Sequence, residues 1–216
     1  MGKYLLLTFI LTSISIITSA QTKAGPAISK DSVLTQYYSG KVGFYSPSNG
    51  LNNGLILGVD GITEFNKFNF FLSGDIDFYP KKTIDIFNSP KPDITDQTIY
   101  LIPLHINFGY KLLDIKDADT KFYAGIGGGY YLYFYNVTYS ANSSGGLLGG
   151  GLPTSTSDSK SGGNTFFSVF GRVLIGKIFI EPRFYFAVRK DDNTGGYSFT
   201  VNPSGFAITL GFQYGK

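Results

Sequence analysis

Hydrophobic and polar residues alternate along most of the chain. Between residues 68 and 79, one parity is apolar or glycine throughout, whereas the other carries Asp75 and Asp77. The same alternation recurs between residues 178 and 189, where the polar parity carries Glu181. A period of two places successive side chains on opposite faces of an extended strand, and no helical spacing fits these segments as well. The pattern therefore predicts an all-β protein.

Extending this reading along the chain predicts eight strands. Each is long enough for the roughly 9 to 11 residues that a tilted strand needs to cross a bilayer. The expected strands are at about 36-46, 55-65, 68-79, 98-112, 121-137, 166-176, 178-189 and 204-214.

The connections between these strands alternate in length. Short turns joining antiparallel neighbours at one end and longer loops at the other are typical of outer-membrane barrels, whose short turns face the periplasm. The sequence thus predicts an eight-stranded antiparallel transmembrane β-barrel with an up-and-down meander and both termini in the periplasm. We expect the 138-165 loop to be mobile because it is rich in Gly and Ser. The short connections are Asn66-Lys67, 113-120 and Gly176-Lys177, the long ones are 80-97 and 138-165, and the intermediate ones are 47-54 and 190-203.

Charged residues occupy only the polar parity of the predicted strands, apart from Lys121 at a strand start. An uncharged apolar face suits lipid, whereas a balanced set of acids and bases suits a closed lumen in which each charge is paired. A soluble barrel with an apolar ligand cavity shows the same alternation and remains an alternative. The predicted lumen network comprises five acids and five bases together with His105: Lys41, Asp60, Glu64, Asp75, Asp77, Lys111, Arg172, Glu181, Arg183 and Arg189.

Composition narrows the class of protein further. Charged residues make up 15% of the 216 residues and aromatic residues 17%, a mixture that favours a membrane barrel over an ordinary soluble domain. The chain has no Cys and one His, which excludes disulfides, cysteine nucleophiles and multi-histidine metal sites. A net charge of +3 gives no reason to expect a nucleic-acid partner.

The N-terminal residues read as a secretory signal peptide. Residues 1-20 contain Lys3, an apolar stretch and then small residues that end at Ala20. We therefore divide the chain into a signal peptide at 1-20, a periplasmic lead-in at 21-35 and an outer-membrane barrel at 36-216.

Three stretches carry a resemblance to a known family. They are Tyr100-Leu-Ile-Pro-Leu-His-Ile-Asn-Phe-Gly-Tyr110, Phe122-Tyr-Ala-Gly-Ile-Gly-Gly-Gly-Tyr130 and Phe206-Ala-Ile-Thr-Leu-Gly-Phe-Gln-Tyr214. With the eight-strand layout, they resemble the small outer-membrane β-barrel family of the OmpA/OmpX type, as found in Bacteroidetes-like bacteria. The resemblance implies a Gram-negative outer membrane, with membrane lipid, lipopolysaccharide and the outer-membrane insertion machinery as partners.

Two features of the expected lumen invite closer reading. His105 falls near Ser73, Asp75 and Asp77, which raises the hypothesis of a catalytic triad, but a triad sealed inside a narrow lumen has no substrate. We therefore interpret His105 as part of the lumen network and expect Asp75 to be its partner. A glycine run on the inward parity leaves room for the rings of Tyr131, Tyr133 and Tyr135, and packing is its simplest role: Gly125, Gly127 and Gly129.

These observations favour a structural or surface-interaction role without enzymatic activity, cofactor or metal. Eight strands enclose a lumen that side chains fill, so a constitutive pore is not expected. The loops at 80-97 and 138-165 are the expected contact surface for an extracellular ligand or protein. A lipid-modifying enzyme and a narrow gated pore remain the alternatives.

Overall fold

The computed structural model describes residues 34-48, 51-82, 94-141, 154-194 and 197-215. The predicted signal peptide, most of the predicted lead-in and the middle of both long loops lie outside these ranges. Within the described ranges, no helix has the length and hydropathy needed to cross a membrane.

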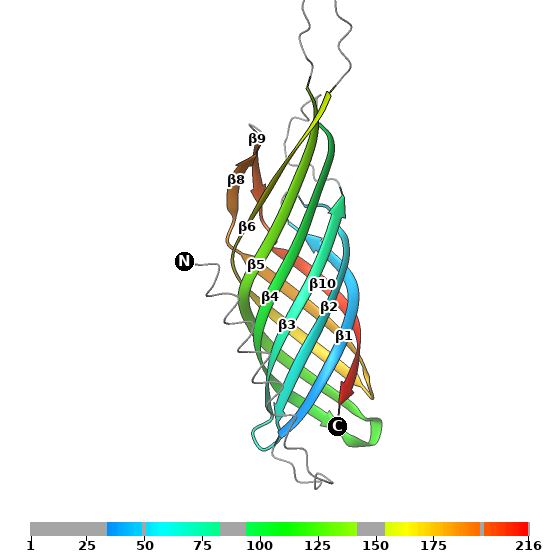
Figure 1. Cartoon of the computed structure of the whole chain (residues 1–216). Helices are drawn as coiled ribbons and strands as arrows, with labels where there is room; N and C mark the ends of the chain where they lie inside the picture. Colours follow the sequence, from blue (N-terminus) through cyan, green and yellow to red (C-terminus); the bar gives the residue numbers. More distant parts are fainter. Residues whose placement is uncertain (1–33, 49–50, 83–93, 142–153, 195–196, 216) are drawn as a thin grey trace, which may run out of the picture. The chain divides into compact units, whose positions relative to one another are not determined.

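Eight antiparallel strands close into a barrel, as predicted (Figure 1). Each of these eight strands pairs with the next barrel strand along the chain, and the first strand closes the ring by pairing with the last from Tyr37 opposite Gly215 to Pro47 opposite Gly205. The strands are β1 (Leu34–Pro47), β2 (Gly54–Phe65), β3 (Phe70–Lys82), β4 (Ile94–Ile115), β5 (Thr120–Ala141), β6 (Thr154–Ile175), β7 (Ile178–Ala187) and β10 (Gly205–Gly215).

Tight turns join the strands at the end where β1 begins and β10 ends. Asn69 has φ 56°, Asp119 has φ 45° and Gly176 has φ 60°, so each turn contains a residue in the left-handed region. Asn, Asp and Gly adopt this conformation most readily, which explains why these residues end the ladders. The β4–β5 turn also contains the short 3-10 helix η1 (Lys116–Ala118).

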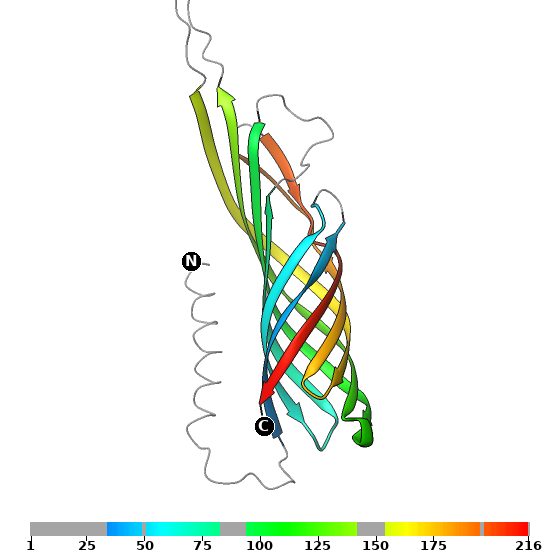
Figure 2. The same ribbon diagram turned by 90° about the vertical axis from the view of Figure 1, so that its right-hand side faces the viewer.

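The opposite end departs from the sequence prediction in two ways. First, β4, β5 and β6 extend beyond the other barrel strands, as Figure 2 shows. β6 begins at Thr154, inside the segment expected to be a mobile loop, and pairs with β5 without a register break up to Ala141. The polar composition of residues 154-165 suggested a loop, but the continuous ladder with β5 makes this segment a strand.

Second, the connection between β7 and β10 contains a hairpin that was not predicted. β8 (Lys190–Thr194) pairs with β9 (Tyr197–Val201) in a separate two-stranded sheet. These strands were missed because only segments long enough to cross a bilayer were counted as strands.

The space beside the inward glycines is occupied by other residues than predicted. A Cβ at Gly125 would meet the Phe170 ring, and one at Gly127 would meet Asn107 and Ser168. Rings from the same strand were expected to fill this space. Instead, residues of the neighbouring strands β4 and β6 occupy it.

Gly129 and Gly128 provide a matched test of this packing. A Cβ at Gly129 would collide with the Leu104 carbonyl oxygen, whereas one at Gly128 would lie 3.6 Å from its nearest neighbour, the Phe166 carbonyl oxygen. We expect Gly129→Ala to lower the free energy of unfolding by about 1 to 3 kcal/mol because the backbone must shift. Gly128→Ala should change it much less. Reversible urea unfolding of both variants measures the difference, and equal losses would contradict the close approach of β4 and β5.

Candidate functional site

The lumen is filled by side chains in three layers. A charge layer occupies the middle, an aromatic layer lies toward the tight turns, and a tyrosine-rich layer lies toward the long loops. The charge layer is defined as Lys41, Asp60, Asp75, Asp77, His105, Arg172, Glu181 and Arg183, all of which are buried.

Arg183 has the most partners in the charge layer. Its Nη2 lies 3.1 Å from Asp75 Oδ2 and 2.8 Å from Glu181 Oε1, and its Nη1 donates to Asn107 Oδ1 at 2.7 Å. Ser168 Oγ also accepts from this side chain at 3.3 Å. The planar fork of a guanidinium can serve several acceptors at once, which a lysine ammonium cannot do in the same geometry.

Arg172 joins two acids from different strands. Its Nη2 lies 2.8 Å from Asp60 Oδ2 on β2 and 2.6 Å from Glu181 Oε2 on β7. Asp60 also accepts a hydrogen bond from Ser39. The charged groups therefore link strands on opposite parts of the ring through the lumen.

Both guanidinium groups also stack on rings of the aromatic layer. Arg172 lies 4.2 Å from the centre of the Phe179 ring, and Arg183 lies 4.5 Å from that of Phe170. Such cation–π contacts strengthen when water is excluded. The aromatic layer thus supports the charge layer from the turn side.

Lys41 supplies the third base of the charge layer. Its Nζ lies 3.0 Å from Asp77 Oδ1, 3.2 Å from Asp75 Oδ2 and 3.9 Å from Glu181 Oε1. Each of the three bases thus contacts at least two acids, so no base in this layer depends on a single partner.

His105 pairs with Asp77, and the expected partner Asp75 was wrong. Its Nε2 lies 3.1 Å from Asp77 Oδ2, while Arg183 Nη1 lies 2.9 Å from Nδ1. Because a guanidinium can only donate, a hydrogen bond between these two groups requires Nδ1 to act as the acceptor. Ser73 bonds to Asp75 and Asn107, so its described hydrogen bonds do not join it to His105 as a nucleophile would require.

Glu64 forms a second, smaller ion cluster near the tight turns. Lys111 Nζ lies 2.9 Å from Glu64 Oε1 and 3.1 Å from Asp114 Oδ2, and Lys121 Nζ lies 3.8 Å from Glu64 Oε2. A small cavity lies between this cluster and the charge layer, and the centre of a water molecule can occupy about 10 Å³ of it. That volume admits about one water molecule.

Arg189 was predicted in the lumen network, and the structure contradicts this. β7 ends at Ala187, so the period of two no longer sets the direction of residue 189. The Arg189 side chain is 65% exposed and its Nε lies 2.8 Å from Asp191 Oδ1. It belongs to the loop end rather than to the lumen.

Tyrosine hydroxyls connect the third layer to the connections at the end with the long loops. Tyr45 donates to the Pro203 carbonyl and Tyr79 to the Asn52 carbonyl. Tyr131 donates to the Val188 carbonyl at 2.7 Å. Three buried rings therefore hold the β1–β2, β7–β8 and β9–β10 connections from below.

The β8–β9 hairpin packs on the extension of β5 and β6. Phe199 is buried against Tyr135, with ring centres 4.5 Å apart, and Tyr133 donates to Asp192 Oδ2 at 2.5 Å. Lys160 Nζ of β6 lies 3.1 Å from Asp192 Oδ1. Burial alone would raise the pKa of Asp192, but hydrogen bonds from Tyr133, the Asn193 backbone and Lys160 hold that pKa below its usual value.

The sequence singled out most of the charged lumen residues but missed the loop anchors. Tyr131 and Tyr133 were placed on the inward parity as space-filling rings, and alternation gives no sign of what their hydroxyl groups bind. Asp192 and Lys160 lay in segments predicted as loops. Within the described ranges, no three His, Asp or Glu side chains come together in a way that could hold a metal ion.

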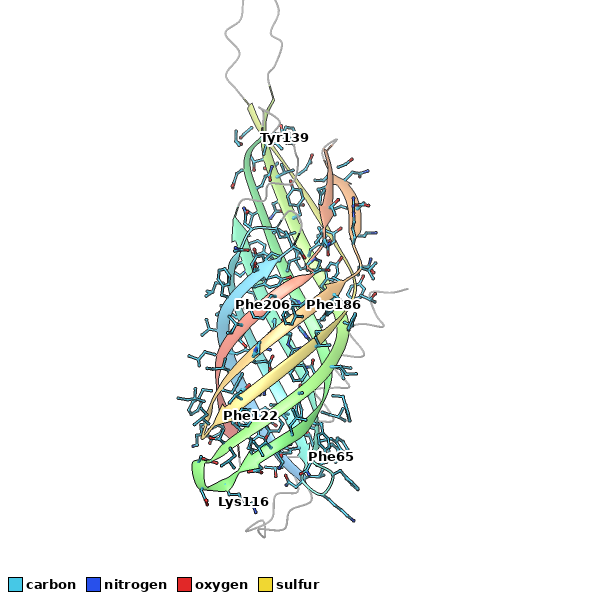
Figure 3. All side chains as sticks on the ribbon, turned by 180° about the vertical axis from the view of Figure 1, so that it is seen from behind. Phe65, Lys116, Phe122, Tyr139, Phe186 and Phe206 are labelled. Carbon is cyan, nitrogen blue, oxygen red and sulfur yellow. The ribbon has the colours of Figure 1, made fainter. Side chains whose placement is uncertain are left out.

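The outward face carries a different set of residues. Leu72, Ile106, Ile126 and Leu210 are all more than 40% exposed. Figure 3 shows Phe65 and Phe122 toward the tight turns and Phe186 and Phe206 toward the loops. Between these levels, the described outward residues of the eight barrel strands include no Asp, Glu, Lys or Arg.

Comparisons with solved structures identify the fold. Neither protein-family models nor curated proteins match the sequence. A major outer membrane protein from Thermus thermophilus matches with a TM-score of 0.54 and 12% identity, over 85% of this chain and 99% of that one. Neisserial surface protein A matches with a TM-score of 0.40 and 12% identity, over 84% and 96%. Ail of Yersinia pestis, in complex with the heparin analogue sucrose octasulfate, matches with a TM-score of 0.40 and 9% identity, over 84% and 97%. The Thermus match confirms the expected outer-membrane type of barrel fold.

Removal of one member of the charge layer tests its coupling. Arg183→Ala leaves Asp75 and Glu181 each without one of its bases, so we expect the free energy of unfolding to fall by about 3 to 5 kcal/mol. Arg189→Ala, the exposed control, should change it by less than about 0.5 kcal/mol. Urea unfolding measures both, and a small effect of Arg183→Ala would show that the lumen is hydrated.

The low pKa of Asp192 predicts how hairpin docking depends on pH. The pKa of Asp192 in the folded protein lies below the value of about 3.9 in the unfolded chain. The ionised Asp192 therefore stabilises the docked hairpin fully above about pH 3.9, and this stabilisation is lost as the pH falls through the folded pKa. Protection of the β8–β9 amides from hydrogen exchange should therefore be lower at pH 3 than at pH 5. Tyr133→Phe removes a hydrogen bond to Asp192 and should reduce this difference, whereas Tyr130→Phe should preserve it. Identical pH profiles for the three proteins would contradict the Asp192 anchor.

Proposed function

We propose that this protein is an integral outer-membrane β-barrel with a closed, charge-paired lumen and a structural or surface-interaction role at its extracellular end. The observation that carries the proposal is the contrast between its two faces. Charges fill the inside, while the outward face between the two aromatic levels is uncharged in the described residues. A soluble barrel with an apolar ligand cavity requires the reverse arrangement.

The height of the apolar face supports a membrane location. On β4, the outward residues run from Tyr100 to Tyr110, and every one between them is apolar: Ile102, Leu104, Ile106 and Phe108. Ten residues at about 3.3 Å each, tilted by about 35 to 45°, span about 23 to 27 Å, close to the apolar band of about 25 Å in outer-membrane barrels.

The packing of the lumen supports a closed interior. Tyr131, Tyr133 and Tyr135 are fully buried above the charge layer, and Phe179 is fully buried below it. A continuous path for solutes would require at least two of these layers to open, with loss of the ion pairs between them. This arrangement favours a closed barrel over a gated pore. It also seals His105 away from lipid substrates, which favours a non-enzymatic role.

The extracellular end supports an interaction role. The hairpin and the tyrosine-anchored connections form an ordered surface, and the segments at 80-97 and 138-165 lie between these connections in the sequence. Rigid presentation of loops lowers the entropic cost of binding. The proposal includes export through residues 1-20, assembly by the insertion machinery and contact with outer-membrane lipid and lipopolysaccharide, with no nucleic-acid partner.

Cell fractionation combined with two arginine variants tests the membrane location. The wild-type chain should appear in the outer-membrane pellet and migrate differently on a gel with and without boiling. Ile106→Arg places a charge in the middle of the apolar face and should cost about 2 to 4 kcal/mol, which reduces insertion. Ser157→Arg, on the same outward face of the sheet but beyond the aromatic level, should insert normally. Recovery of the wild-type chain as a soluble periplasmic protein would overturn the proposal.

A further inference from the structure

We propose that the outward face of the β4–β5–β6 extension binds the saccharide headgroups of glycolipids in the outer leaflet. This inference rests on the proposed function, because it requires the barrel to stand in that membrane. The extension face is defined by three cross-strand rows: Tyr100, Phe134 and Ser161; Thr98, Asn136 and Ser159; and Asp96, Thr138 and Ser157.

The extension face continues the lipid-facing surface without a break. Along β5, the outward residues pass from Ile126 through Tyr130 and Phe134 to Asn136. The Tyr130 ring lies where a Cβ on Gly163 of β6 would stand, so this ring covers the neighbouring strand. Residues that follow directly above an apolar band and an aromatic level meet the headgroup region of the same leaflet.

The chemistry of the extension face suits sugars better than phosphates. Above the aromatic row, the outward side chains of the three strands are hydroxyls and one amide, with Asp96 as the single charged group. Phosphate recognition relies on Arg or Lys, which this set lacks. Hydroxyl and amide groups can instead donate to and accept from sugar hydroxyls. The exposed rings of Tyr100 and Phe134 offer apolar surface to the faces of sugar rings.

The opposite face of the extension is already occupied, which fixes the sheet in place. Tyr135 and Val137 are buried, and Phe199 of the hairpin packs against Tyr135. The ion pair between Lys160 and Asp192 joins β6 to the hairpin from the same side. The outward rows are therefore held rigid before any ligand binds, which lowers the cost of ordering them.

A single-cysteine label provides a direct readout, because the chain has no cysteine of its own. Ser159→Cys carries an environment-sensitive dye on the extension face, and Ser198→Cys carries it on the exposed side of the hairpin. The full chain is placed in phosphatidylethanolamine–phosphatidylglycerol vesicles with and without lipopolysaccharide. We expect the label at residue 159 to respond to lipopolysaccharide, and the label at residue 198 to respond much less.

Binding variants test which residues produce this response. Thr98→Ala combined with Asn136→Ala removes two hydrogen-bonding groups and should raise the half-saturating lipopolysaccharide concentration about tenfold. Asn193→Ala combined with Ser198→Ala, on the exposed side of the hairpin, should change it less than about twofold. Free core oligosaccharide should compete for binding, whereas inorganic phosphate should not.

The outcomes separate this inference from the proposed function. Heat-dependent migration in both kinds of vesicle, with no response at residue 159, would overturn the saccharide site alone. Competition by phosphate, or equal effects of the two double variants, would also overturn it. Failure of the chain to insert into either kind of vesicle would overturn the proposed function and this inference together.

Discussion

Burial of charge inside a narrow lumen is the constraint on which the rest of the structure depends. A charge removed from water is tolerated only when opposite charges and hydrogen bonds surround it. Arg172 and Arg183 meet this condition by bridging acids on β2, β3 and β7, so the ion pairs tie distant strands together. The same requirement explains three buried polar residues beside the charges. Ser39 donates a hydrogen bond to Asp60, and Asn107 and Ser168 accept hydrogen bonds from Arg183. The barrel is thus held together across its interior as well as around its circumference.

The two ends of the lumen exclude water in different ways. Toward the tight turns, aromatic rings stack under the guanidinium groups and leave a cavity with room for about one water molecule. Toward the loops, buried tyrosines fill the space and use their hydroxyl groups to bind the connections above. A phenol is suited to this boundary because its ring is apolar and its tip is polar. The tyrosine-rich layer therefore forms the boundary between the closed interior and the solvated loops.

Much of the barrel could be predicted from the sequence, because alternation reports directly which face a side chain occupies. That rule placed Asp75, Asp77 and Arg183 on the inside and Leu72 and Ile106 on the outside. It failed where tertiary contacts override local composition. Residues 154-165 look like a loop but form a strand through their ladder with β5, and Arg189 follows the end of β7 rather than its period. Alternation also could not predict which side chains pair inside the lumen. Asp75 lies directly opposite His105 in the β3–β4 ladder, but the His105 side chain contacts Asp77. The β8–β9 hairpin had a local signal in Gly195-Gly196 and the alternation that follows, but length alone excluded it as a barrel strand.

The tyrosine anchors bind carbonyl groups of the main chain at Asn52, Val188 and Pro203 rather than side chains. Every residue type offers the same carbonyl, so these hydrogen bonds do not depend on which amino acids the connections carry. The barrel can therefore keep the attachment points of its surface segments while their side chains change freely. In such a scaffold, the position of the connections and the chemistry of their side chains can evolve independently. Substitutions at the surface then need no new contacts to hold the connections in place.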